Sequence, residues 1–407
     1  MVAILGVASR TQVSGVEEIY ETYLERLKGA YDIDMGIISE MDILEHNLDE
    51  ISKHSLVIVV VLTGGTRKYI LRIAYATRYI VMITHTYQNS LASGLHAAYI
   101  ISKTKRRNLL HIHAPPERFS EYDKDLILAL RNIAEYYGKE VLLLGVDKVF
   151  LFYEEYNTSR LSQILGIKVK TIPLERFIEL YNNETEGEYF PMLKSLEGGL
   201  SNEVIGKITR LYTLTRKLMR GYVGGGIRCF PLIVSLGITP CTIVANLIDS
   251  GIPVACEADL PSLITMLLIQ AITNQKSFIA NVEDFDGKNI VIAHCTVAPS
   301  LTSDYRFIEH FETKLPIAIE GKLFMREVTL VKLSPDFTEI FIAEGKITRS
   351  GRFSDKFCRT QAIIETKADF SKFLSGAYAH HIVMTYGKHA EKIGRITKAL
   401  GLRVVYV

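Results

Sequence analysis

The chain has 407 residues, of which 48% are hydrophobic and 23% are charged, and its formal net charge is +2. This length predicts two or three domains of ordinary globular composition. The small net charge gives no reason to expect nucleic acid or an anionic membrane as a partner, and no apolar run is long enough to span a membrane.

The cysteine pattern indicates a reducing environment. All five cysteines lie in the second half of the chain, and none forms a CxxC pair. An odd number of cysteines in apolar surroundings is typical of free thiols and argues against a disulfide framework. The N-terminus also lacks the charged-then-apolar pattern of a secretion signal. We therefore expect a soluble, cytoplasmic protein.

The first part of the chain alternates between apolar runs and segments with helical spacing. The predicted strands cover residues 2–7, 33–38, 56–62, 79–84 and 108–113. This alternation predicts a doubly wound, mostly parallel sheet, which we assign to an N-terminal α/β domain at residues 1–115. Thr63-Gly64-Gly65-Thr66 follows the third strand and could cradle an anion, but it lacks the lysine of a nucleotide-binding P-loop.

A second alternation predicts a central α/β domain at residues 116–255. Its predicted helices include 123–137 and 157–165, and its predicted strands include 140–145, 149–153 and 168–172. We interpret Gly224-Gly225-Gly226 as a flexible joint between a helix and a strand. Beyond residue 275, β-like segments separated by turns predict an antiparallel sheet or barrel. The expected fold class is α/β, with two doubly wound parallel-sheet domains followed by a β-rich C-terminal domain at residues 256–407.

Residues 251–262 carry the clearest functional signal. A short apolar strand ends in Glu257 and Asp259, and Pro261 and Ser262 then open an apolar helix. Ligands of open α/β sheets bind at the carboxyl ends of strands. Two carboxylates buried this close together need a cation or a proton. A structural alternative, in which Asp259 only caps the helix, does not explain Glu257.

Candidate imidazoles lie further along the chain. His294 ends an apolar strand, His310-Phe311-Glu312 follows soon after, and His380-His381 precedes a late strand. Imidazoles with carboxylates suit manganese, zinc or iron, although hydrogen-bonded structure is the commoner role of a lone histidine. Adjacent strand residues point to opposite faces, so at most one of His380 and His381 should face a given site, whereas His310 and Glu312 should share a face.

These residues resemble the L-fucose isomerase and L-arabinose isomerase superfamily, in particular its archaeal fucose-isomerase-like members. The motifs that carry the resemblance are Cys256–Ser262 with Thr265-Met266, His294-Cys295-Thr296, His310-Phe311-Glu312, Cys358-Arg359-Thr360, His380-His381 and Asn89-Ser90. The resemblance implies three domains and a homo-oligomer, a trimer or hexamer, in which the first domain of one subunit lies near a neighbour's site.

The resemblance also implies an activity: an intramolecular oxidoreductase that interconverts aldoses and ketoses, using a divalent metal, Mn²⁺ above all, to form an enediolate of a small sugar. The implied metal ligands are Asp259, His294 and one of His380 and His381. Glu257 and Asp259 are the candidate catalytic residues, with their order unresolved. The candidate substrate-binding residues are Arg228, His310, Glu312, Arg359 and Asn89.

One departure from the family leaves the activity open. The fucose enzymes have a glutamate ligand in the region that matches residues 227–237, but residues 228–235 contain no acid here. Either Glu257 substitutes for it, or the metal site is altered, or the isomerase activity is absent. The alternative function is a catalytically altered sugar-binding or regulatory protein on the same scaffold.

Overall fold

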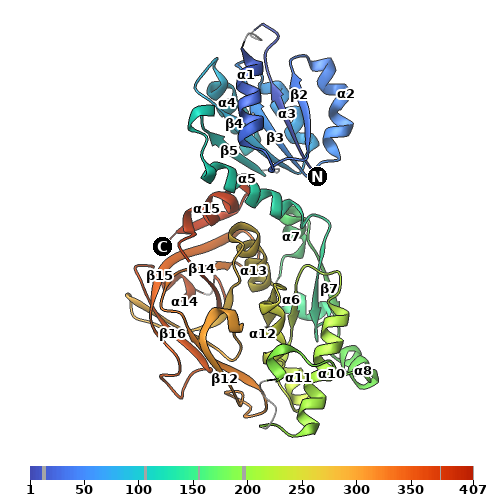
Figure 1. The fold of residues 1–407 in the computed structure, drawn as a ribbon, viewed down its shortest axis with the longest axis vertical. Coiled ribbons are helices and arrows are strands. Elements are labelled where there is room, and N and C mark those ends of the chain that lie inside the picture. The colour runs from blue at the N-terminus through green and yellow to red at the C-terminus, as the bar shows by residue number, and fades with distance from the viewer. Residues whose placement is uncertain (12–14, 105–107, 155, 195–198, 376, 407) are drawn as a thin grey trace. The chain divides into compact units, whose positions relative to one another are not determined.

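The computed structural model describes residues 1–11, 15–104, 108–154, 156–194, 199–375 and 377–406. The chain divides into two compact units. The first unit comprises Met1–Tyr137 with Lys392–Leu402, and the second comprises Gly138–Glu391 with Arg403–Val407. The second unit contains both the second parallel sheet and the β-rich region (Figure 1). The division into three domains at residues 115 and 255 stays a prediction.

The first unit is built on a five-stranded parallel sheet with the order β2-β1-β3-β4-β5. Its strands are β1 (Val2–Val7), β2 (Ile33–Ile38), β3 (Leu56–Val61), β4 (Tyr79–Thr84) and β5 (Leu109–His113). Its helices are α1 (Val16–Arg26), α2 (Met41–Ser52), α3 (Arg67–Ala76), α4 (Ser90–Ser102), α5 (Glu121–Ala134) and, from the far end of the chain, α15 (Ala390–Ala399). All residues of β1, β3 and β4 are buried, as expected of central parallel strands with both faces covered. The predicted strands of this region are confirmed.

The second unit contains a four-stranded parallel sheet with the order β7-β6-β8-β9. Its strands are β6 (Glu140–Leu144), β7 (Lys168–Ile172), β8 (Gly225–Ile227) and β9 (Val254–Cys256). The helices around it are α6 (Lys148–Tyr153), α7 (Thr158–Leu165), α8 (Leu174–Asn183), α9 (Pro191–Lys194), α10 (Asn202–Leu218), α11 (Cys229–Leu236), α12 (Cys241–Asp249) and α13 (Leu260–Thr273).

Two predictions in this sheet are wrong. Residues 149–153 form helix α6, whose first turn is closed by Asp147 Oδ1 accepting from the Phe150 N–H at 2.8 Å; a short apolar run alone does not distinguish a strand from a helix. The three glycines are no joint either, because Gly225 and Gly226 lie in the buried strand β8. A Cβ on Gly226 would lie 3.0 Å from Ala258 Cα, so glycine is needed here for close approach of the chain.

The β-rich region contains a closed ring of antiparallel strands in the order β14-β17-β10-β11-β16-β15, which the pairing of β14 with β15 completes. The strands are β10 (Phe278–Phe285), β11 (Asn289–His294), β14 (Glu327–Leu333), β15 (Glu339–Ser350), β16 (Thr360–Thr366) and β17 (His381–Tyr386). Strand β18 (Arg403–Tyr406) extends β15 in parallel, and β12 (Thr302–Ile308) pairs with β13 (Ala318–Leu323). The structure thus has parallel-sheet α/β regions and a β-rich region, as predicted.

A membrane-spanning helix is not found among the described residues, since none of their helices combines sufficient length with sufficient apolar character.

Candidate functional site

The turn after β9 places Glu257 at the carboxyl end of the sheet. Glu257 and Ala258 both have positive φ angles, 57° and 56°, and the Ala258 N–H donates to Ile227 O of the neighbouring strand at 3.1 Å. Side chains with a Cβ rarely adopt this left-handed conformation, and such residues occur often at functional sites. The turn therefore holds Glu257 in a defined position, directly before helix α13.

Asp259 caps helix α13, as the structural alternative expected. Its Oδ1 accepts from the Ser262 N–H at 2.9 Å, and its Oδ2 accepts from Ser262 Oγ at 2.8 Å. Oδ2 also lies 2.8 Å from Lys332 Nζ and 2.9 Å from His381 Nδ1. Burial would raise the pKa of Asp259, but the charges of Lys332 and His381 and their hydrogen bonds hold it well below its usual range.

Lys332 is a residue of the site that the sequence reasoning missed. It lies on β14 and is completely buried, and its ammonium group also donates to Ser262 Oγ at 2.6 Å. Burial lowers the pKa of Lys332, whereas the adjacent Asp259 raises it. The available signal was a single lysine in residues 328–333, whose other members are apolar apart from Thr329, because a buried lysine requires a partner.

Glu257, His380 and His381 form the group of the described residues that suits a metal ion, with one ligand atom from each lying within 4.8 Å of the others. His380 Nε2 lies 3.3 Å from Glu257 Oε2, and His381 Nε2 lies 3.8 Å from Glu257 Oε1. The expectation that only one of these histidines could face a site is wrong. Strand β17 begins at His381, so His380 lies outside the alternating strand geometry, and both imidazoles reach Glu257.

The electrostatics of this group keep Glu257 ionised. Burial alone would raise the pKa of Glu257, but a hydrogen bond with His380 and the positive charges that His381 and His294 carry when protonated at low pH lower it to about 2. The same hydrogen bond raises the pKa of His380. Burial lowers the pKa of His381, which favours a neutral imidazole.

His294, at the end of β11, lies beside this group. Its ring centroid is 5.6 Å from that of His381. The side chain is buried, its Nδ1 has no hydrogen-bond partner among the described residues, and burial lowers its pKa to about 4. His294 is thus a neutral imidazole that lies beside the His381 ring.

A cavity of about 480 Å³ opens beside these groups in the second unit. Its lining consists of Phe150, Glu154, Tyr156, Arg228, Cys229, Phe230, Pro231, Val234, Glu257, Asp259, Ala379 and His380. The Arg228 guanidinium lies 4.6 Å from the centre of the Phe150 ring. The cavity is large enough for a small sugar and combines charged groups with apolar walls.

The remaining predicted residues do not line this cavity, although the His310 ring centroid is 6.1 Å from that of Phe230, which does. Arg359 is buried, and its guanidinium donates to Glu309 O at 2.8 Å and to Glu309 Oε1 at 3.2 Å. His310 and Glu312 lie in a turn after β12, so the predicted shared strand face is wrong; the Lys314 N–H donates to His310 O at 3.1 Å across this turn. Asn89 precedes α4 with a φ of 60° and belongs to the first unit.

In the comparisons with known proteins, the chain is similar to sugar isomerases. No family model matches the chain. The sulfoquinovose isomerases of Priestia aryabhattai and Priestia megaterium are each 21% identical to it over an alignment of 431 positions, which covers 96% of this chain and 96% of each relative. The chain is thus similar over nearly its full length to a sugar isomerase, consistent with a relation to the fucose and arabinose isomerase superfamily. The comparisons give no support to the predicted tie to archaeal members.

Proposed function

We propose that the protein is an aldose–ketose isomerase that acts on a small sugar in the cavity of the second unit. The observation that carries this proposal is an ionised carboxylate, Glu257, paired with an imidazole, His380, on the cavity wall. The full-length similarity to sulfoquinovose isomerases supports the same reaction class.

Glu257, His380 and His381 are the proposed ligands of a divalent metal, with Mn²⁺ as the expected ion. The buried Nε2 of His381 has no hydrogen-bond partner among the described residues and lies next to Glu257. One carboxylate and two imidazoles form a donor set that suits a divalent transition metal. Bound there, the metal would polarise the carbonyl and the adjacent hydroxyl of the sugar.

Glu257 is the proposed proton carrier. Its carboxylate would accept the proton from the hydroxyl-bearing carbon next to the aldehyde and return it to the former aldehyde carbon, while the proton of that hydroxyl passes to the former aldehyde oxygen, which leaves the ketose. The left-handed turn at Glu257 and Ala258 fixes the carboxylate in one position for both transfers. Phe150, Phe230 and Val234 give the cavity an apolar wall, in which Phe230 and Val234 are exposed at 40% and 83%.

An anionic sugar is the first substrate to test. Sulfoquinovose, which names the relatives, carries a sulfonate, and Arg228 on the cavity wall forms no ion pair with any residue that the structure describes. A planar guanidinium suits a sulfonate or phosphate group. The second candidate, a sugar-binding or regulatory protein, is favoured by the absence of an acid in residues 228–235.

The decisive experiment follows proton transfer directly. The protein is dialysed against a chelator, returned to Mn²⁺, and incubated in D₂O with sulfoquinovose and a panel of neutral and anionic aldoses. We expect deuterium to appear at the carbons of the carbonyl and hydroxyl pair only after metal is restored. Thermal stabilisation by a sugar without deuterium exchange would instead identify the binding protein.

Two further properties belong to the proposal. A trimer or hexamer is the expected assembly, which light scattering coupled to gel filtration would measure. A reducing cytoplasm is the expected location, because all five cysteines are free thiols, including Cys229 and Cys256, whose sulfur atoms lie 3.8 Å apart.

A further inference from the structure

Lys332 is an unusual charged residue of the second unit. It is completely buried, on a strand of the closed β-ring, although lysine is almost never buried without a partner. Its ammonium group has two partners, Asp259 Oδ2 at 2.8 Å and Ser262 Oγ at 2.6 Å. The Leu333 N–H also donates to Thr265 Oγ1 at 3.1 Å, which ties this end of β14 to helix α13.

Asp259 Oδ2 has three polar partners within hydrogen-bonding distance. This oxygen accepts from Lys332 and Ser262 and lies 2.9 Å from His381 Nδ1, while Oδ1 accepts from the backbone N–H at the start of α13. A cation therefore already contacts the oxygen that would otherwise be offered to a bound metal.

The orientation of His381 follows from this arrangement. An ionised carboxylate can only accept hydrogen bonds, so Nδ1 of His381 must carry the hydrogen, and in the neutral imidazole Nε2 then presents its lone pair. Nε2 is buried, has no hydrogen-bond partner in the described part of the chain, and lies 3.8 Å from Glu257 Oε1. A carboxylate that fixes the outer nitrogen of a metal-binding histidine is a common means of orienting the ligand.

We propose that Lys332 is a positioning residue: its ammonium group occupies the cation position on Asp259, so that Asp259 orients His381 toward the site instead of binding the metal itself. This inference rests on the proposed metal site of Glu257, His380 and His381. It gives Asp259 a role that the sequence reasoning did not consider, and it adds a residue distant in sequence to the machinery of the site.

The test uses the full chain without substrate. Wild type and K332M are freed of metal, and Mn²⁺ binding is measured by calorimetry. The ring nitrogens of His381 are observed by ¹⁵N NMR and identified by their loss in H381Q. We expect K332M to bind Mn²⁺ 10-fold to 100-fold more weakly and to show a mixture of His381 tautomers where the wild type shows one.

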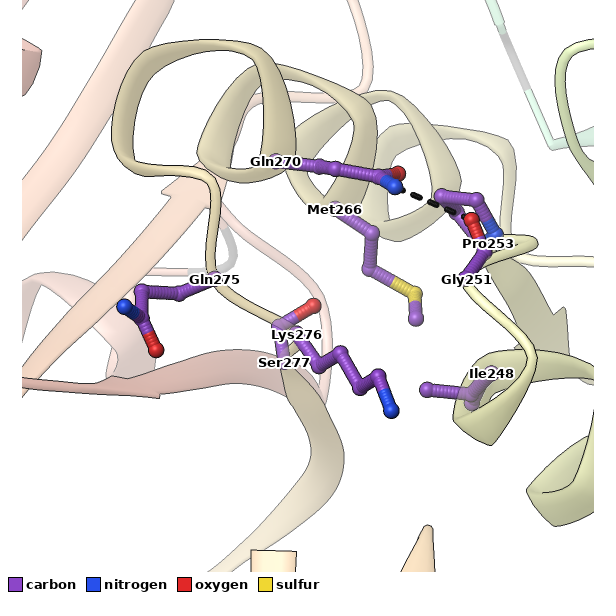
Figure 2. Close-up of a pocket in the computed structure, with 8 residues that line it drawn as sticks. All are labelled: Ile248, Gly251, Pro253, Met266, Gln270, Gln275, Lys276 and Ser277. Atoms are coloured by element: carbon purple, nitrogen blue, oxygen red, sulfur yellow. Dashed lines mark hydrogen bonds between the residues drawn. The ribbon is translucent and has the colours of Figure 1, made fainter. Parts of the chain in front are cut away.

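Two further variants control for folding. The double variant D259N/K332M leaves no unpaired buried charge and is expected to fold even if K332M does not, yet to retain the weak Mn²⁺ binding. The matched control is K276M. Lys276 also pairs with an aspartate, at 3.3 Å from Asp249, but it lies beside a small cavity of about 10 Å³ with Ile248 and Met266 (Figure 2). Its Mn²⁺ affinity should equal that of the wild type.

Unchanged Mn²⁺ affinity and a single His381 tautomer in K332M and in D259N/K332M would overturn the inference. Tighter binding in K332M would also overturn it, because Lys332 would then compete with the metal for Asp259. If the wild type bound no Mn²⁺, the proposed metal site would fail, whereas the tautomer comparison would still decide the role of Lys332.

Discussion

The two parallel sheets of this protein differ in the side chains at the carboxyl ends of their strands. At the carboxyl edge of the first unit, polar groups bond one another: the Ser9 N–H donates to Thr63 Oγ1 at 2.6 Å, and Thr66 Oγ1 lies 3.0 Å from Ser93 Oγ. At the corresponding edge of the second unit, Glu257 and Arg228 line a cavity. The carboxyl edge of a sheet is thus a favourable position for a site, and in the second unit its charged side chains face a cavity, whereas the hydroxyl groups named in the first unit bond one another.

The largest expected effect is at Glu257. Replacement by Gln (E257Q) keeps the shape of the side chain but removes the proton acceptor, so kcat/KM should fall by about 100-fold to 10,000-fold. The measurement is deuterium exchange into the sugar at saturating Mn²⁺. The matched control is E154Q, since Glu154 lines the same cavity but is exposed. Equal losses in both variants would contradict the assignment of the base.

The next largest effect is expected at Gly226, which packs against the turn formed by Glu257 and Ala258. In G226A the new Cβ would lie 2.7 Å from Leu143 Cδ2 and 3.0 Å from Ala258 Cα. This overpacking should lower the free energy of unfolding by about 1–3 kcal/mol and displace Glu257. Urea-induced unfolding measures the first effect and deuterium exchange the second.

A glycine with open surroundings provides the control for that variant. Gly206 lies within helix α10, where a Cβ would meet nothing within 4 Å, so G206A should raise stability by about 0.5–1 kcal/mol. If G226A proved as stable as G206A, the close approach of β8 to the turn would not be a constraint.

A smaller effect is expected at the edge of the first unit. Ser90 Oγ donates to Val61 O and accepts from the His85 N–H. Because Ser90 is buried, S90A should leave these groups unpaired and cost about 1–3 kcal/mol of unfolding free energy. Mn²⁺ affinity should not change. A loss of Mn²⁺ binding in S90A would show that the first unit takes part in the metal site, contrary to the contrast between the two edges.

The sequence predicted the parts of this structure that depend on local pattern. Strand β3 was recognised because its residues, Leu56–Val61, are uniformly apolar. Glu257 and Asp259 were recognised because a strand ends and a helix begins around them. Both features are written in neighbouring residues, so periodicity and capping rules suffice to find them.

The parts that were missed depend on distant segments. Lys332 contacts Asp259 across 73 positions of sequence, and no local rule reveals that pairing. The turning of both His380 and His381 toward Glu257 depends on the residue at which β17 begins, and strand ends are poorly defined by sequence. The glycines of β8 were misread because close packing of backbone against backbone leaves the same pattern as a flexible joint.

The smallest expected effect is a pH-dependent ion pair in the first unit. Asp32 accepts from the Val2 N–H at 2.7 Å and from Arg131 at 2.6 Å. Burial would raise the pKa of Asp32, but these two hydrogen bonds and the charge of Arg131 hold it below its usual value. A carboxylate with a lowered folded-state pKa stabilises the protein above its unfolded-state pKa of about 4, and this contribution is lost as the pH falls through the folded-state value.

D32N should therefore be less stable than the wild type from pH 5 to pH 8, and the difference should shrink below pH 4. Both side chains are partly exposed, at 32% for Asp32 and 24% for Arg131, so the difference should stay below about 1 kcal/mol. Urea-induced unfolding at pH 3, 4 and 6 measures it. In an R131M background the effect of D32N should be smaller at pH 6, because part of the stabilisation comes from the guanidinium. A difference that grows as the pH falls would contradict the lowered pKa of Asp32 and leave Arg131 as a surface residue without energetic coupling to the sheet.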